Sequence, residues 1–237
     1  MATAAQVKTF INKVAPIAQA KAAGRDKWSM PSVCIAQACC ESAYGTSPKM
    51  INANAILGIK VGKSKVHFGT AWKDKAYSTK TKECYDGKTY VAINDMFRAY
   101  DSIEDAIEDY YDMLASCSRY KGCLNQTDPL KCITAIKNGG YATSPTYIST
   151  IMSIVKQYNL TQYDSMVTGC TSATNCYPAV TYTGSSIADA LKSIGVDTSY
   201  SYRCKIAEKN GILGYKGTAG QNTYMLELLK DGKLKKA

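Results

Sequence analysis

The chain of 237 residues has a single histidine, His67, and none of its ten cysteines belongs to a Cys-x-x-Cys pair. A catalytic zinc site needs several nitrogen or sulfur ligands, and a cysteine peptidase needs a Cys–His pair, so the sequence disfavours both classes. We therefore expect no metal and no cofactor. Cys117 with Cys123, and Cys170 with Cys176, have spacings that would close small loops in an oxidising compartment.

The sequence also lacks an apolar run long enough to cross a bilayer. Its first eight residues lack the continuous apolar core of a secretory signal. The net charge of +10 favours polyanions, but lysine dominates and no arginine-rich helix or basic-aromatic stripe concentrates the charge. We expect no membrane insertion and no nucleic-acid binding, whereas an anionic cell wall is a compatible partner.

Apolar spacing predicts a mainly helical (α+β) chain with one small β-element. Two β-prone runs, residues 79–85 and 88–92, on either side of Asp86-Gly87 predict a hairpin, and Ser102 is placed to cap a helix. Residues 52–59 are expected to be rich in turns. The predicted helices cover residues 4–23, the segment from Pro31 towards Gly45, 101–114, 129–137, 145–158, 186–194, 199–209 and 218–230.

The helix that begins at Pro31 contains mostly small and apolar residues before Glu41, and Gly45 follows shortly after. We expect this helix to be buried, with Glu41 in its last turn, near the negative end of the helix dipole. Apolar neighbours and the dipole both disfavour the ionised carboxylate. A protonated carboxyl in this position suits a general acid that protonates a leaving-group oxygen.

A second carboxylate, Glu83, lies on the predicted hairpin with Lys82, Tyr85 and Trp72 nearby in the sequence. A hairpin over a buried helix forms the wall of a groove, where aromatic side chains can stack on sugar rings. One acid on a helix and one carboxylate on a hairpin form the pair that glycoside hydrolysis needs. Taken alone, Glu83 would be an ordinary exposed strand residue.

Five motifs in order resemble the bacterial endo-β-N-acetylglucosaminidases of glycoside hydrolase family 73. The resemblance covers roughly residues 5–160. Its motifs are Glu41-Ser42-Ala43-Tyr44-Gly45-Thr46-Ser47 with Asn54-Ala55-Ile56-Leu57-Gly58-Ile59-Lys60, then Trp72, Thr81-Lys82-Glu83-Cys84-Tyr85, Phe97-Arg98-Ala99-Tyr100-Asp101-Ser102, and Gly140-Tyr141-Ala142-Thr143-Ser144-Pro145-Thr146-Tyr147.

This resemblance implies a lysozyme-like helical lobe with a small β-hairpin lobe. It also implies cleavage of the bond from N-acetylglucosamine to N-acetylmuramic acid in peptidoglycan glycan strands. Glu41 matches the family's general acid, Glu83 its second carboxylate, and Tyr141 the tyrosine that lines the reacting sugar's subsite. Glu83 could activate water, or only stabilise charge while the substrate's N-acetyl group attacks. The expected substrate-binding aromatics are Trp72, Tyr85, Tyr44 and Tyr147.

We expect three parts: a catalytic domain over residues 1–160, a linker over 161–185 rich in Thr, Ser and Gly, and a helical module over 186–237. The module resembles small modules at the ends of phage lytic enzymes, which implies binding to a cell-wall polymer. With no leader segment, the chain resembles a phage or prophage endolysin. Such an enzyme stays in the host cytoplasm until a holin opens the membrane.

Three alternatives share this fold. A muramidase or a lytic transglycosylase also uses a single Glu at the end of a helix, and the pairing of Glu83 with the Tyr141 motif favours the glucosaminidase over both. A non-catalytic wall-binding phage protein would keep the fold without the chemistry. Retention of both carboxylates disfavours it.

Overall fold

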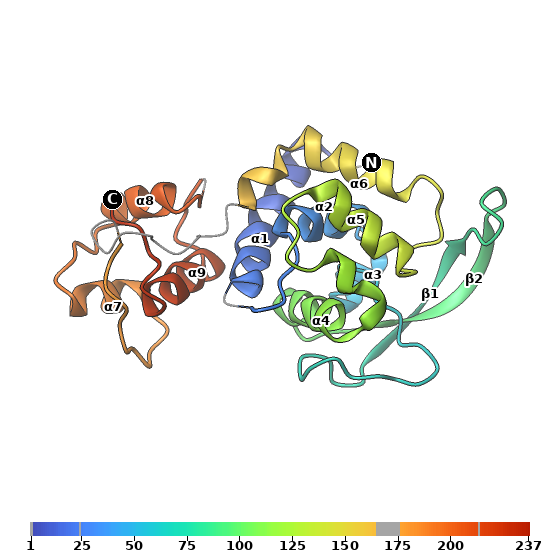
Figure 1. The fold of residues 1–237 in the computed structure, drawn as a ribbon, viewed down its shortest axis with the longest axis horizontal. Coiled ribbons are helices and arrows are strands. Elements are labelled where there is room, and N and C mark those ends of the chain that lie inside the picture. Colours follow the sequence, from blue (N-terminus) through green and yellow to red (C-terminus); the bar gives the residue numbers. More distant parts are fainter. Residues whose placement is uncertain (1, 24, 165–175, 213) are drawn as a thin grey trace. The chain divides into compact units, whose positions relative to one another are not determined.

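The computed structural model describes residues 2–23, 25–164, 176–212 and 214–237. The chain divides into two compact units, Met1–Asp164 and Ser165–Ala237 (Figure 1). The first is mostly helical with one two-stranded antiparallel sheet, so the predicted fold class is confirmed. Its elements are α1 (Ala4–Ala22), α2 (Pro31–Glu41), α3 (Pro48–Ala53), β1 (Ala76–Glu83), β2 (Val91–Arg98), α4 (Ile103–Ser116), η1 (Ser118–Cys123), α5 (Pro129–Asn138), α6 (Tyr147–Gln157) and η2 (Leu160–Tyr163).

Helix α2 lies at the centre of the first unit, where it packs against α1, α5, α6 and η2. Pro31 occupies its first turn, and every residue from Pro31 to Cys39 is buried. The helix is apolar on all sides because it has neighbours on all sides, as expected for a core helix. Glu41 is its last residue and emerges from the core.

Local capping explains several helix boundaries. Thr3 and Gln6 form a capping box at the start of α1, and the Ser102 hydroxyl accepts the Asp105 N–H at the start of α4, as predicted. The Ser47 hydroxyl accepts the Met50 N–H and caps α3. Helix α3 lies largely before the turn-rich segment predicted for 52–59, and the sequence pattern did not predict it because one helical turn and a half carries too little periodicity.

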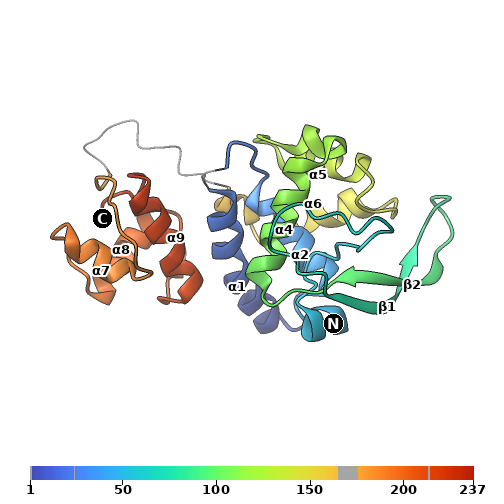
Figure 2. The same ribbon diagram turned by 90° about the horizontal axis from the view of Figure 1, so that it is seen from below.

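The hairpin is longer than predicted. Its antiparallel strands pair from Ala76 opposite Arg98 to Glu83 opposite Val91, and it projects from the helices (Figures 1 and 2). A seven-residue loop connects the two strands. Asp86 accepts the Lys88 and Thr89 N–H groups, and these hydrogen bonds close the turn within the loop. These backbone hydrogen bonds lower the pKa of Asp86 to about 2.

A buried ion pair attaches the base of the hairpin to α4. Arg98, at the end of β2, donates to both carboxylate oxygens of Asp109 at 3.0 and 2.9 Å, and the Tyr100 hydroxyl donates to Asp109 at 2.7 Å. The Arg98 guanidinium also lies over the rings of Phe68 and Trp72, at 4.4 and 4.1 Å. The loop before β1 and helix α4 are thereby both fixed to the end of β2.

The second unit contains three helices in its described part, α7 (Ile187–Ser193), α8 (Tyr200–Lys209) and α9 (Ala219–Lys230). The first and last segments of this described part are hydrogen-bonded to each other, because the Tyr177 N–H donates to the Leu234 carbonyl at 2.8 Å. Thr218 and Gln221 form a capping box at the start of α9. The core of this unit includes Ile187, Leu191, Ile206, Met225, Leu228, Leu229 and Leu234.

Across the described ranges, none of the helices combines the length and the hydropathy that a bilayer crossing requires. Cys117 and Cys123 are free thiols, so the small loop that they could have closed is open. Cys176 is disulfide-bonded, and Cys170 lies outside the described residues.

Candidate active site

Glu41 is held at the end of α2 by a short chain of buried hydroxyl and amide groups. The Tyr147 hydroxyl donates to Glu41 Oε1 at 3.1 Å and accepts from the Gln37 amide at 2.9 Å. The Gln37 carbonyl oxygen in turn accepts the hydroxyl proton of Tyr110. Burial, followed by the charge of Glu41, raises the pKa of Tyr147 well above its usual value, so this hydroxyl stays a donor at neutral pH.

The other oxygen of Glu41 faces Lys49 and Gly58. Lys49 Nζ lies 3.4 Å from Glu41 Oε2, with both side chains largely buried. Gly58 has a φ of +63°, and a Cβ there would stand 2.8 Å from the same oxygen. A glycine is required at this position for its backbone conformation and for the space that Glu41 occupies.

Glu83 ends β1, and both of its oxygens have a partner. Lys60 Nζ lies 2.6 Å from Oε1 and also contacts Asp95 at 2.8 Å. The Thr143 hydroxyl donates to Oε2 at 2.7 Å, and the same hydroxyl accepts the Cys84 N–H at 3.1 Å. Burial works to raise the pKa of Glu83, but the Lys60 and Thr143 hydrogen bonds outweigh it, and the pKa lies below its usual value. Glu83 is therefore ionised at neutral pH.

Two short segments each contact both carboxylates. In residues 57–60, Gly58 leaves the space that the Glu41 carboxyl occupies, while Lys60 binds Glu83. In residues 141–147, Thr143 binds Glu83 while Tyr147 binds Glu41. The segments are themselves joined, because the Tyr141 hydroxyl donates to the Leu57 carbonyl at 2.6 Å. The end of α2 and the end of β1 thus face one shared region.

Tyr141 is half-buried, with its ring in edge contact with Tyr110 and Tyr120. Burial, followed by the nearby Tyr147 and Glu41, raises its pKa well above the usual value. Its hydroxyl is therefore neutral and fixes the segment that carries Gly58.

The remaining expected aromatics lie in three different surroundings. Trp72 is 2% exposed, its indole N–H donates to the Lys75 carbonyl, and Arg98 covers its ring, so in this structure it packs the base of the hairpin rather than facing a sugar. Tyr85 is 71% exposed in the hairpin loop. Tyr44 is half-buried beside Tyr158, with ring centroids 6.0 Å apart.

The sequence reasoning missed four residues that hold the carboxylates: Gln37, Lys49, Lys60 and Thr143. Lys60 and Thr143 stand inside the motifs that carry the family resemblance, three and two residues from Leu57 and Tyr141, and that position was the available signal. Gln37 is a polar side chain one turn before Glu41 on a buried helix, which predicts a hydrogen-bond partner.

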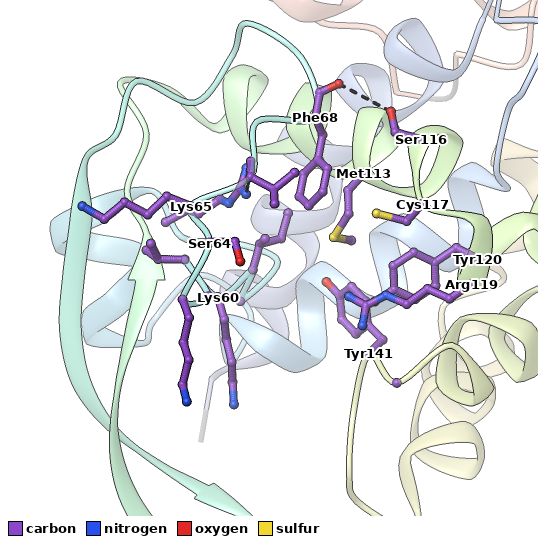
Figure 3. A pocket seen from close by; sticks show the side chains of 18 of the residues that line it. Lys60, Ser64, Lys65, Phe68, Met113, Ser116, Cys117, Arg119, Tyr120 and Tyr141 are labelled. Atoms are coloured by element: carbon purple, nitrogen blue, oxygen red, sulfur yellow. Dashed lines mark hydrogen bonds between the residues drawn. The ribbon is translucent and has the colours of Figure 1, made fainter.

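A cavity of about 630 Å³ opens beside Tyr141, between the 58–68 loop and the end of α4 with η1 (Figure 3). Gly58, Lys60 and Tyr141 belong both to its lining and to the segments that contact the carboxylates. Within the described ranges, no group of three or more His, Cys, Asp or Glu side chains is placed to hold a metal ion.

Comparison with known proteins places these residues in one family. Residues 17–160 match the glucosaminidase family, described as mannosyl-glycoprotein endo-beta-N-acetylglucosaminidase. Exo-glucosaminidase LytG of Bacillus subtilis is 31% identical over 142 residues, 58% of this chain and 47% of LytG. Peptidoglycan hydrolase FlgJ of Vibrio parahaemolyticus is 31% identical over 155 residues, 62% of this chain and 46% of FlgJ.

The chain spans about half the length of these two relatives. The catalytic domain of the autolysin Auto from Listeria monocytogenes has a similar structure, with a TM-score of 0.54 and 31% identity over 69% of this chain and 90% of that domain. Since the family match covers more than half of the chain, this protein belongs to the glucosaminidase family, glycoside hydrolase family 73.

Proposed function

We propose that residues 1–164 hydrolyse the β-1,4 bond between N-acetylglucosamine and N-acetylmuramic acid in peptidoglycan. The observation that carries this proposal is the pairing of two carboxylates through the shared segments 57–60 and 141–147. The relatives support the substrate class, since one is a glucosaminidase and another a peptidoglycan hydrolase by name.

Glu41 acts as the general acid. Its proton passes to the glycosidic oxygen while the bond from that oxygen to C1 of N-acetylglucosamine breaks, and the muramic acid leaves as an alcohol. The Tyr147 hydroxyl and the space at Gly58 support this role, because they fix the direction of the carboxyl. In the second step water supplies a hydroxyl group to C1 and gives its other proton to the Glu41 carboxylate, which restores the general acid.

Glu83 stabilises positive charge at C1, and the substrate's N-acetyl oxygen is the nucleophile. Both oxygens of Glu83 already have partners, so accepting a proton from water would require one of these hydrogen bonds to break. Attack by the N-acetyl group gives an oxazolinium intermediate and retention at C1. NMR of the first-formed anomer tests this step: the β-anomer supports it, and the α-anomer would assign Glu83 as the base of an inverting reaction.

The bond itself is tested by mass spectrometry of digested peptidoglycan after borohydride reduction. Reduced N-acetylglucosamine at the new chain ends supports the proposal. Reduced muramic acid would indicate a muramidase, and an anhydro-muramic product would indicate a lytic transglycosylase. Absence of any new end would leave a wall-binding protein without hydrolytic activity.

We further propose that the second unit binds a cell-wall polymer and that the whole chain serves as a phage endolysin released at lysis. A small unit with its own core, joined after the unit that carries the carboxylates, supports this architecture. The excess of lysine supports attraction to an anionic wall. Sedimentation of residues 165–237 with purified walls, with and without stripping of their anionic polymers, tests the binding.

A further inference from the structure

The cavity beside Tyr141 is strongly cationic, and we refer to it below as the cationic cavity. Among the described residues that line it there are five cations and no carboxylate. The cations are Lys60, Lys63, Lys65, Arg98 and Arg119. A concave surface with one sign of charge attracts a ligand of the opposite sign.

Two of these cations are already neutralised inside the protein. Lys60 pairs with Glu83 and Asp95, and Arg98 pairs with Asp109. Lys63, Lys65 and Arg119 form no ion pair with any described residue. The side chain of Lys65 extends away from Tyr141 in Figure 3, which leaves Arg119 and Lys63 as the other two lining cations without an ion pair to a described residue.

Arg119 is exposed, and its guanidinium donates no hydrogen bond to another described residue. Its guanidinium lies 4.7 Å from the ring centroid of Tyr120, and a Cβ at Gly140 would stand 3.9 Å from its Nη1. Figure 3 shows Arg119 beside Tyr141 on one wall of the cationic cavity. A guanidinium whose N–H groups are free of protein partners can bind a carboxylate through two of them.

The rest of the lining is partly apolar. No Asp, Glu, Asn or Gln lines the cationic cavity in the described part of the chain, and its uncharged polar side chains are hydroxyl groups such as those of Ser64, Ser116 and Tyr141. Val61, Val66, Phe68 and Met113 supply an apolar surface. Together, a cation and an apolar surface fit a short aliphatic peptide that carries a carboxylate.

We propose that the cationic cavity binds a carboxylate of the peptide stem on the muramic acid, with Arg119 and Lys63 as its ligands. This inference rests on the proposed function, in which the sugar chain passes Tyr141 and Glu41. Gly58, Lys60 and Tyr141 line the cavity and belong to the segments beside the two carboxylates, so the cavity adjoins the region where the proposed function places the sugar chain and its stems. The protein then recognises peptide-bearing glycan rather than bare glycan.

The test compares soluble, uncross-linked peptidoglycan chains with the same chains after their carboxyl groups are converted to neutral amides by carbodiimide coupling. Binding is measured by calorimetry on the Glu41→Gln variant, which does not require turnover. We expect amidation to weaken binding by about tenfold, the effect of one lost charged hydrogen bond. Equal affinity for the two preparations would overturn the proposal.

Variants identify the residues involved. Arg119→Gln and Lys63→Gln, each added to Glu41→Gln, should weaken binding to native chains by roughly threefold to tenfold and bring their affinity close to that for amidated chains. Arg119→Lys should recover part of the loss, and Lys8→Gln on the exposed face of α1 is the matched control and should change nothing. Equal losses on native and amidated chains would overturn the assignment.

Two further results separate the possible failures. If the preference for native chains disappears after hydrofluoric acid removes phosphate polymers, the bound anion is a wall-polymer phosphate and the proposal is wrong. If the wild-type protein cleaves neither preparation, the proposed function fails, while the calorimetric comparison still decides the role of the cationic cavity.

Discussion

Different partners hold the carboxyl groups of Glu41 and Glu83. Tyr147 donates to Glu41, and burial keeps the tyrosine hydroxyl protonated by raising its pKa. Lys60 and Thr143 lower the pKa of Glu83 against the effect of burial, so Glu83 carries a negative charge. Acid-assisted cleavage of a glycoside needs this combination of a positioned carboxyl and a fixed carboxylate.

Replacing Thr143 with Val should alter the pH dependence of activity. The substitution removes the hydroxyl that donates to Glu83 Oε2, so the pKa of Glu83 rises. The acidic limb of the kcat/KM profile should therefore move to higher pH. At the optimum, kcat/KM should fall by about tenfold, since a hydrogen bond to a charged group contributes roughly 1.5–3 kcal/mol.

Thr143→Ser is the matched control, because it keeps the hydroxyl, and its profile should overlie that of the wild type. A Val variant that loses activity equally at every pH would show that Thr143 acts only through the packing of the loop.

Among the elements, the sequence predicted α2 and the existence of the hairpin but not the length of the hairpin. Pro31 and the uniformly apolar run define a core helix by local signals alone. The strands extend to Ala76 and Arg98, where Arg98 is fixed to Asp109 on α4. This contact joins two different elements, so the pattern within either element does not predict it. The same cluster buries Trp72, and no local pattern distinguishes that tryptophan from one that stacks on a sugar.

Asp109→Asn should destabilise the first unit by about 3–5 kcal/mol, because it leaves the buried Arg98 charge without a counter-charge. Urea unfolding followed by circular dichroism measures the change. Asp101→Asn removes a carboxylate that pairs with Lys73 and Lys75 at the surface, and it should leave the midpoint unchanged. Similar shifts for both variants would mean that the buried pair does not anchor the hairpin.

Asp164 should make the stability of the first unit depend on pH. Its Oδ1 accepts the Ser32 N–H at 2.7 Å, its Oδ2 has no hydrogen-bond partner among the described residues, and burial raises its pKa to about 6 from 3.8. Because the folded pKa is the higher one, the folded state binds the proton more tightly, and the free energy of unfolding increases as the pH falls from 7 towards 4. The ionised form costs roughly 2–3 kcal/mol at neutral pH.

Asp164→Asn should remove this increase and stabilise the protein at pH 7.5, which urea titrations at pH 5 and 7.5 would detect. An unchanged difference between the two pH values in the variant would exclude Asp164 as its origin.

For the chain as a whole, changes in composition predicted a division near residue 160, and the compact units divide at Asp164 and Ser165. Composition and periodicity could not predict which distant segments contact each other. Lys60 and Glu83 are 23 residues apart, and Thr143 and Glu83 are 60 apart, whereas periodicity reports only neighbours along one element. Chemistry alone suggested the pair of Glu41 and Glu83, and the family resemblance added Tyr141 to it, because the resemblance compares whole motifs in order.

A chain ending at residue 164 should cleave purified peptidoglycan as fast as the full chain, because every proposed catalytic residue precedes that point. It should lyse intact cells at least tenfold more slowly, since a linked binding module raises the local concentration at the wall. Turbidity assays on cells and on purified walls measure the two rates. Equal lysis of intact cells by both chains would mean that the second unit does not target the wall.

We propose that Glu41 supplies the proton that breaks the glycosidic bond, and the activity of a Glu41→Gln variant tests this role. The measurement is kcat/KM for the release of reducing ends from purified peptidoglycan, with thermal unfolding as a check on folding. We expect a loss of about 10²–10⁴-fold with an unchanged Tm, because the amide keeps the shape of the side chain but cannot donate the proton. Glu104→Gln, at an exposed carboxylate on α4, should match the wild type. A folded Glu41→Gln variant that retains activity within a few-fold of the wild type would contradict the account.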